Sequence, residues 1–205
     1  MPAVRVVLAS RNAGKVRELG ALLAGLGLEL VGLDAFGELP DVVEDRDTFR
    51  GNALKKAEEV ASATGRPTLA DDSGLEVDAL GGRPGVLSAR YAGEPSDDVA
   101  NNHKLLRELA GTPDAQRTAR FRCVLALVDP TGALADEPVF AEGTLEGRIG
   151  TAPRGGGGVG YAPLFVLPDG RTTAELDPAD KNAISHRGQA ARRMRELLAE
   201  RLGPR

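Results

Sequence analysis

Residues 4–26 have the sequence VRVVLASRNAGKVRELGALLAGL, and this segment indicates the fold class. Val4 to Ala9 form a short, mostly apolar run, which predicts a buried β-strand. The polar turn Ser10–Lys15 follows this run. Apolar residues then recur at helical spacing, and Gly27 favours the end of a helix; they are Val16, Leu19, Leu22, Leu23 and Leu26. A strand, a loop and a helix in this order are typical of an α/β protein.

The rest of the chain continues the alternation of strands and helices. Apolar runs and period-2 patterns predict strands at residues 28–31, 67–70, 75–80, 120–127, 139–149 and 164–167. Helices are predicted after Asp47 or Thr48, from Ser96 to Leu109 with Val99 on the apolar side, after Asp177, and at the end of the chain. We therefore predict a mixed β-sheet flanked by helices, in one domain of residues 1–205.

Composition and charge argue against several kinds of partner. The formal net charge is -4 at pH 7, so the surface lacks the positive field that nucleic-acid binding requires. Cys123 is the single cysteine, which excludes an internal disulfide and favours a reducing compartment. The apolar run at the amino end is too short to cross a membrane. We expect a cytoplasmic protein without a nucleic-acid or membrane partner.

The turn Ser10–Lys15 is a candidate phosphate-binding loop. A loop between a strand and a helix directs backbone N–H groups at an anion, and Asn12 and Lys15 add a side-chain donor and a positive charge. The loop is not a P-loop, because Ala9 and Val16 stand where that motif needs Gly and Ser or Thr. An ordinary capped turn with an exposed lysine is the alternative interpretation.

Asp71 and Asp72 form a second candidate site. They lie between two predicted strands, and we expect a tight turn at Asp71–Gly74. Adjacent carboxylates at a strand end can bind a hard cation or accept a proton from water, and oxygen ligands suit Mg²⁺ better than zinc. Glu44, from an acidic loop, is a further candidate for the same ion. Aspartates that only satisfy the backbone of a hairpin are the alternative.

A third cluster lies near the start of the last helix. Lys181, Ser185, His186 and Arg187 combine two cations with an imidazole, which suits contacts with phosphate and base. A glycine-rich loop, 155–158, precedes this cluster in the chain. His103 lies on a polar helix face and is interpreted as structural. Together the three clusters predict a nucleotide-binding site.

Five motifs make the interpretation specific, since in this order they resemble the inosine triphosphate pyrophosphatase family. They are Ser10–Lys15 (SRNAGK), Ala70–Gly74 (ADDSG), Gly81–Gly85 (GGRPG), Ser88–Tyr91 (SARY) and Ser185–Gly188 (SHRG). The likeness extends over nearly the whole chain, including 175–176 and 181–184. It implies an elongated mixed sheet, two lobes with a nucleotide cleft between them, and a homodimer.

The resemblance also implies roles for individual residues. Asp72 would be the general base, and Asp72, Asp71 and Glu44 would bind Mg²⁺. The residues implied to hold the triphosphate are Ser10, Arg11, Asn12, Ala13, Gly14 and Lys15. Those implied to contact the rest of the nucleotide are Ser73, Val159, Gly160, Tyr161, Ala162, Lys181, His186 and Arg187.

The segment Val159–Ala162 departs from the family pattern. Members of the family usually have Phe-Gly-Tyr-Asp here, whereas this chain has Val-Gly-Tyr-Ala. A base stacked on an aromatic ring gains about 1–3 kcal/mol, so its loss can weaken binding roughly 5- to 150-fold. Tyr161 is a candidate for stacking in place of the missing ring.

The sequence therefore predicts an Mg²⁺-dependent hydrolase that converts deaminated purine nucleoside triphosphates (ITP, dITP and XTP) to the monophosphate and pyrophosphate. Two alternatives stay open. One is a pyrophosphatase with altered or relaxed base specificity, including action on modified or pyrimidine nucleotides, because Val159 and Ala162 replace the usual residues. The other is a nucleotide-binding protein without turnover.

Overall fold

The computed structural model describes residues 3–156 and 159–202. Contacts divide the chain into two compact units, each made of segments that are distant in the sequence. The first unit comprises Met1–Asp72, Cys123–Gly143 and Gly188–Arg205. The second comprises Ser73–Arg122 and Thr144–Arg187. Residues 157 and 158 of the predicted glycine-rich loop lie outside the described residues.

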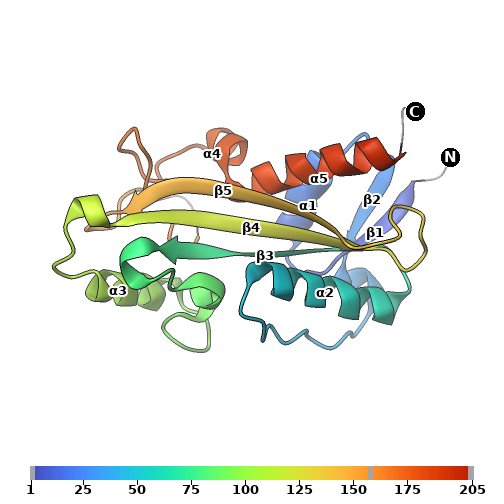
Figure 1. The fold of residues 1–205 in the computed structure, drawn as a ribbon, viewed down its shortest axis with the longest axis horizontal. Coiled ribbons are helices and arrows are strands. Elements are labelled where there is room, and N and C mark those ends of the chain that lie inside the picture. Colours follow the sequence, from blue (N-terminus) through green and yellow to red (C-terminus); the bar gives the residue numbers. More distant parts are fainter. Residues whose placement is uncertain (1–2, 157–158, 203–205) are drawn as a thin grey trace. The chain divides into compact units, whose positions relative to one another are not determined.

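The strands form one mixed sheet of six strands in the order β2-β1-β3-β4-β5-β6 (Figure 1). β1 (Val4–Leu8) is parallel to β2 (Leu28–Gly32), with Val4 opposite Leu28, and also to β3 (Thr68–Val77), with Val7 opposite Thr68. β4 spans Thr118–Val128. β5 (Val139–Ile149) is antiparallel to β6 (Phe165–Val166). The predicted mixed sheet flanked by helices is confirmed.

The first unit begins with a β-α-β segment, as predicted from residues 4–31. α1 (Ala13–Leu22) connects the parallel strands β1 and β2, which require such a crossover. α2 (Phe49–Thr64) has Thr48 as its N-cap, whose hydroxyl accepts a hydrogen bond from the Gly51 N–H. It ends at Gly65, in the left-handed conformation that glycine adopts without strain.

The predicted turn at Asp71–Gly74 is wrong, because β3 is one continuous strand from Thr68 to Val77. Asp71 and Asp72 are both buried, and each carboxylate lies beside a lysine from a neighbouring helix. A buried carboxylate is tolerated when a positive charge compensates it, so it does not need the solvent that a turn provides. The strand therefore continues through the acidic pair.

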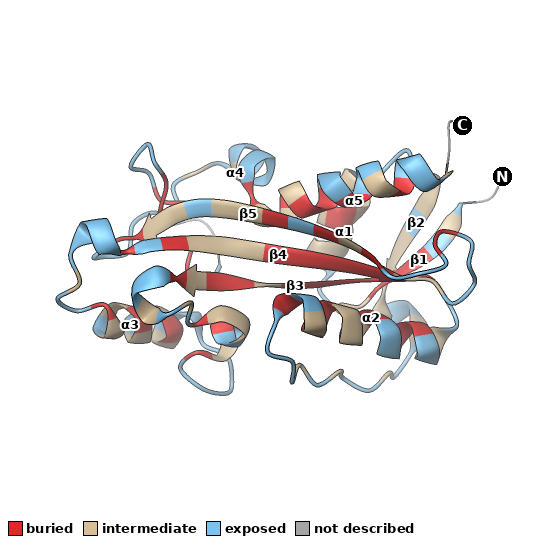
Figure 2. Cartoon of the chain, viewed as in Figure 1, coloured by how far each residue is buried: buried red, intermediate tan, exposed pale blue. Residues whose placement is uncertain are grey.

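Each unit has its own hydrophobic core (Figure 2). In the first unit α1 and α5 (His186–Leu202) pack on one side of the strands, where Leu19, Met194 and Cys123 are fully buried. α2 packs on the other side with Phe49, Ala53 and Ala57 inward. Alternate strand residues therefore face different helices.

The core of the second unit includes α3 (Asp98–Glu108), from which Leu105 is fully buried. Val99 was predicted on the apolar side of this helix, but it is 66% exposed, so that prediction is wrong. Its neighbours in the first turn explain the exposure, since Asp97 caps the helix and Asp98 is exposed. α4 is the short helix Pro178–Ile184, capped by Asp177 as predicted.

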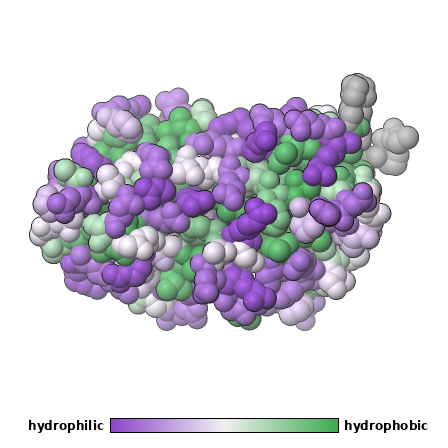
Figure 3. Space-filling view, in the orientation of Figure 1, coloured by the Kyte–Doolittle hydropathy of each residue, from purple (hydrophilic) through white to green (hydrophobic). Residues whose placement is uncertain are grey.

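The surface is mixed in polarity. Hydrophilic and hydrophobic side chains alternate over the face that Figure 3 shows. Within the described ranges, no helix combines the length and apolar composition that a membrane crossing needs.

Candidate functional site

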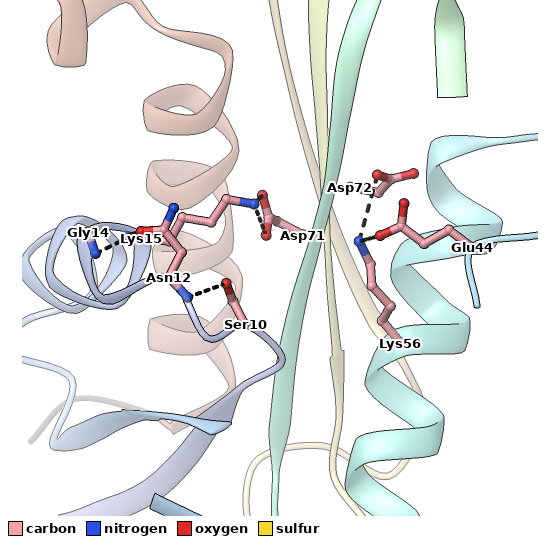
Figure 4. Close-up of polar contacts among 8 residues, drawn as sticks. All are labelled: Ser10, Asn12, Gly14, Lys15, Glu44, Lys56, Asp71 and Asp72. Carbon is pink, nitrogen blue, oxygen red and sulfur yellow. Dashed lines mark hydrogen bonds and ion pairs between the residues drawn. The ribbon is translucent and has the colours of Figure 1, made fainter. Parts of the chain in front are cut away.

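The loop between β1 and α1 is a capped helix start (Figure 4). Asn12 is the N-cap, and its side-chain oxygen accepts hydrogen bonds from the N–H groups of Gly14 at 2.8 Å and Lys15 at 3.2 Å. The Ser10 hydroxyl in turn accepts one from the Asn12 N–H at 3.1 Å. A Cβ at Gly14 would lie 3.0 Å from the Asn12 oxygen, so this close approach favours glycine. The structure thus shows the capped turn, and phosphate binding by this loop stays a prediction.

Arg11 points away from the cap and toward the segment after β2. Its guanidinium donates a hydrogen bond to the Leu39 carbonyl at 2.8 Å and forms longer ion pairs with Asp34 and Asp41. Arg11 was predicted to hold the triphosphate. In the structure its charge lies near Asp34 and Asp41, and a contact of Arg11 with the triphosphate stays a prediction.

Lys15 and Asp71 form a partly buried ion pair. The Lys15 ammonium lies 3.0 and 2.9 Å from the two carboxylate oxygens of Asp71, whose side chain is 3% exposed. The Lys15 side chain is 29% exposed. Asp71 therefore neutralises and orients a lysine that remains open to a solvent-borne anion.

Asp72 is the next residue along β3 and points to the opposite side of the strand, toward α2 (Figure 4). Its Oδ1 atom lies 3.7 Å from the ammonium of Lys56. The same ammonium lies 2.6 Å from Oε1 of Glu44. Two carboxylates from distant parts of the first unit thus converge on one lysine.

Burial controls the ionisation of this cluster. Desolvation raises the pKa of Asp72 to about 6; Lys56 and Asn52 oppose this shift, and Glu44 and Asp71 add to it. Burial alone would lower the pKa of Lys56, but the charges of Asp72, Glu44 and Asp71 together raise it above its ordinary value. Asp72 is therefore a carboxylate that titrates near neutral pH beside a lysine that stays protonated.

The structure does not assemble all three predicted metal ligands. Asp72 and Glu44 share one lysine, whereas Asp71 faces α1. Within residues 3–156 and 159–202, no three His, Cys, Asp or Glu side chains are grouped as a metal site would require. The donor set Glu44 and Asp72 still fits Mg²⁺, because this ion commonly uses one or two carboxylates and takes its other ligands from phosphates and water.

Lys56 was not predicted from the sequence as a site residue. It lies on α2, one turn after Asn52, which is 1% exposed. This polar pair, spaced i and i+4, borders the apolar face formed by Phe49, Ala53 and Ala57. The sequence signal is an asparagine at helical spacing from Phe49 on the apolar side of the helix. Such a polar residue at a predicted core position could have directed attention to Lys56, one turn later.

The second unit contains a pocket of about 320 Å³. It brings together predicted site residues from widely separated parts of the chain, namely Ser73, Val159, Gly160, Tyr161, Ala162, Lys181, Ser185, His186 and Arg187. Its other lining residues are Gly74, Leu75, Ser88, Ala89, Asp98, Phe121, Leu145, Thr173 and Ile184. A mainly apolar cavity with a small number of polar side chains is typical of a site for a small molecule.

Phe121 provides an aromatic wall of this pocket. Its ring stacks on His186, with centroids 5.0 Å apart and an interplanar angle of 15°. The centroid of the Phe121 ring also lies 4.5 Å from that of the Phe165 ring. The sequence predicted only a strand over residues 120–127, because a period-2 pattern does not distinguish a core position from a pocket wall.

The residues of the altered segment occupy different positions in the pocket. Val159 is 84% exposed, whereas Tyr161 and Ala162 are buried. The Tyr161 hydroxyl donates a hydrogen bond to the Ser88 carbonyl at 2.7 Å, and burial raises the pKa of Tyr161. Tyr161 is thus a fixed part of the wall, with its hydroxyl already bonded.

Comparison with known proteins identifies the group to which the chain belongs. A sequence model of the Ham1 family matches residues 6–197. A protein of Geobacillus kaustophilus named dITP/XTP pyrophosphatase is 53% identical over 199 residues, which cover 97% of this chain and 96% of that protein. A protein of the same name from Desulforamulus reducens is 52% identical over 196 residues, which cover 95% of this chain and 96% of that protein.

Solved structures agree with the sequence relatives. The structure of a HAM1 protein from Coxiella burnetii has a TM-score of 0.89 and 43% identity, and the match covers 96% of this chain and 99% of that one. A nucleoside-triphosphatase (dITP/XTP pyrophosphatase) from Mycobacterium abscessus has a TM-score of 0.78 and 46% identity, with 91% and 95% covered. The family resemblance predicted from the sequence motifs is therefore confirmed. The chain belongs to the Ham1 family.

Proposed function

We propose that the chain hydrolyses deaminated purine nucleoside triphosphates (ITP, dITP and XTP) to the monophosphate and pyrophosphate, and so keeps these purines out of DNA and RNA. The observation that carries the proposal is the buried Asp72 carboxyl beside Lys56 and Glu44. The names of the curated relatives support the same activity.

Asp72 is assigned as the general base. A water molecule attacks the α-phosphorus and forms the new P–O bond while Asp72 accepts its proton. The bond from the α-phosphorus to the oxygen that bridges to the β-phosphorus breaks, and pyrophosphate leaves with that oxygen. A pKa of about 6 for Asp72 suits this role, because the group is mostly ionised at pH 7 and still basic enough to take a proton.

Lys56 is assigned as a positioning residue. Its ammonium holds the carboxylates of Asp72 and Glu44 in one place, at 3.7 and 2.6 Å. Glu44 and Asp72 are the residues that would hold Mg²⁺, which would supply charge neutralisation at the phosphates. On the other side of β3, Lys15 is oriented by Asp71 and is assigned to the phosphates.

The pocket of the second unit is assigned to the purine. Its wall contains the stacked pair Phe121 and His186, and Lys181 and Arg187 supply its positive charges. Ser73 is one of the residues that line the pocket, and it follows Asp72 directly in the chain. The homodimer and the cytoplasmic location implied above are kept as parts of this proposal.

Relaxed base specificity is the second candidate function. It is favoured by Val159, a largely exposed residue that lines the pocket and has no aromatic ring. The contribution of stacking on this residue is then small, and selection falls to the polar groups of the pocket.

The test is pyrophosphate release with Mg²⁺ from ITP, XTP, GTP, ATP and dTTP, beside the Asp72→Asn variant. Turnover of ITP and XTP well above the others, lost in the variant, supports the proposal. Equal turnover of all five supports relaxed specificity. Binding of ITP without release of pyrophosphate from any nucleotide would refute both and identify a nucleotide-binding protein.

A further inference from the structure

The polar side of α3 holds the main chain of two pocket segments. Asp98 Oδ2 accepts a hydrogen bond from the Gly160 N–H at 2.7 Å, and the Asn102 amide donates one to the Gly160 carbonyl at 2.9 Å. Asn101, between them, donates to the Ala89 carbonyl at 3.0 Å. It also accepts a bond from the Ala92 N–H at 2.7 Å.

The match between Gly160 and the helix is specific in both geometry and chemistry. Asp98 and Asn102 are four residues apart, so they lie one turn from each other on the same side of α3. One offers an acceptor to the glycine N–H and the other a donor to its carbonyl. Gly160 has a φ of +66°, a left-handed conformation that glycine adopts without strain. Loop peptide groups usually bond to water, whereas both groups of this residue are fixed by side chains.

We call the two hydrogen bonds of Asp98 and Asn102 with Gly160 the clamp. The clamp fixes the main chain on which the neighbours of Gly160 lie. Val159 and Tyr161 both line the pocket. Tyr161 also donates a hydrogen bond to the carbonyl of Ser88, which precedes the residue held by Asn101. The helix therefore holds both the segment at Gly160 and the segment at Ser88 and Ala89, which are two walls of one cavity.

We propose that Asp98 and Asn102 are positioning residues for purine selectivity, acting through Gly160. This inference rests on the proposed function, since it assigns the base to this pocket. A planar base is selected by a slot of fixed width when its walls do not move. Val159 provides no aromatic ring, so base selection in this chain depends on where the main chain of the wall is held.

The test compares two clamp variants, Asp98→Ala and Asn102→Ala, with the wild type. Each removes about one net hydrogen bond, so we expect the KM for ITP to rise roughly 3- to 10-fold while kcat changes less than about 2-fold. We also expect the preference for ITP over GTP to fall by a similar factor. The inhibition constant of inorganic triphosphate, which carries no base, should be unchanged.

Matched controls come from the same helix. Val99→Ala and His103→Ala alter exposed residues beside Asp98 and Asn102 that do not line the pocket, and they should behave as wild type. Asp98→Asn keeps an oxygen acceptor for the Gly160 N–H and should restore the wild-type KM. Gly160→Ala strains the clamp from the loop side, so it should reproduce the clamp phenotype even if a helix variant fails to fold.

Failure of the proposed function and failure of the positioning role give different experimental results. If the wild type releases no pyrophosphate from ITP, the proposed function is wrong, and the clamp is then tested by the affinity for inosine monophosphate alone. Clamp variants that bind inosine monophosphate as tightly as His103→Ala would overturn the inference. An equal loss of ITP turnover and inorganic triphosphate binding would overturn it as well, because that pattern indicates general disruption.

Discussion

Replacement of Asp72 by asparagine should stabilise the protein while it removes activity. The side chain keeps its size but loses a charge that burial disfavours, as the rise in the pKa of Asp72 to about 6 from 3.8 indicates. In the metal-free protein this difference in pKa corresponds to about 3 kcal/mol at pH 8. Active-site groups are often held at such a cost in stability.

The sign of the pH dependence follows from proton binding. Between about pH 4 and pH 6 the folded state binds more protons at Asp72 than the unfolded state does, so the free energy of unfolding falls as pH rises through this window. The advantage of Asp72→Asn is therefore full above about pH 7, roughly halved at pH 5, and absent below about pH 4.

The assay is urea and thermal unfolding of both proteins in EDTA at pH 5 and pH 8. For a chain of this size, we expect the variant to melt roughly 6 to 12 °C higher at pH 8. Asp45→Asn is the matched control, because Asp45 also pairs with an α2 lysine but is exposed, and that pairing lowers the pKa of Asp45. A variant less stable than the wild type at pH 8, or a difference that does not change with pH, would show that burial does not destabilise the ionised Asp72 carboxylate.

Three further predictions concern the cluster, the core and the pocket. Lys56→Gln should lower the free energy of unfolding in EDTA by about 3 kcal/mol, because Asp72 loses its compensating positive charge, and Mg²⁺ should restore part of this stability by replacing that charge. An unfolding temperature of the variant that does not rise with Mg²⁺ in calorimetry would contradict this. Arg117→Met should lower the free energy of unfolding by about 3–5 kcal/mol, since the buried guanidinium donates hydrogen bonds to four carbonyls. The control Arg120→Met, at a more exposed ion pair, should lower it by less than about 1 kcal/mol. Equal losses for both variants in urea unfolding would show that burial is not the cause. Val159→Phe should lower the KM for ITP about 5-fold or more by adding a stacking surface, and an unchanged KM would refute that.

Local patterns predicted the elements that local interactions determine. The β-α-β start, the caps at Thr48 and Asp177 and the strand Val139–Ile149 agree with the sequence analysis because periodicity and capping depend on nearby residues. The turn expected at Asp71–Gly74 does not occur because lysines from two helices compensate the carboxylates. Those partners are distant in the sequence, and no local pattern contains them.

In the candidate site, too, contacts between distant segments could not be predicted from local sequence patterns. Resemblance to the family selected the residues that line the pocket, although they come from segments around 73, 160 and 185. It did not indicate that Asp71 and Asp72 face opposite sides of β3, which follows only once the strand is known to be continuous. Lys56 and Phe121 were missed because each looks like an ordinary helix or strand residue in its own segment.

The most direct test of the account is the fate of the attacking oxygen. ITP is hydrolysed with Mg²⁺ in water enriched in ¹⁸O, and the products are weighed by mass spectrometry, with Asp72→Asn as the control. Attack of water at the α-phosphorus with Asp72 as the base predicts one ¹⁸O atom in inosine monophosphate, none in pyrophosphate, and no comparable turnover by the variant. Label in pyrophosphate, release of orthophosphate, or full activity of Asp72→Asn would contradict it.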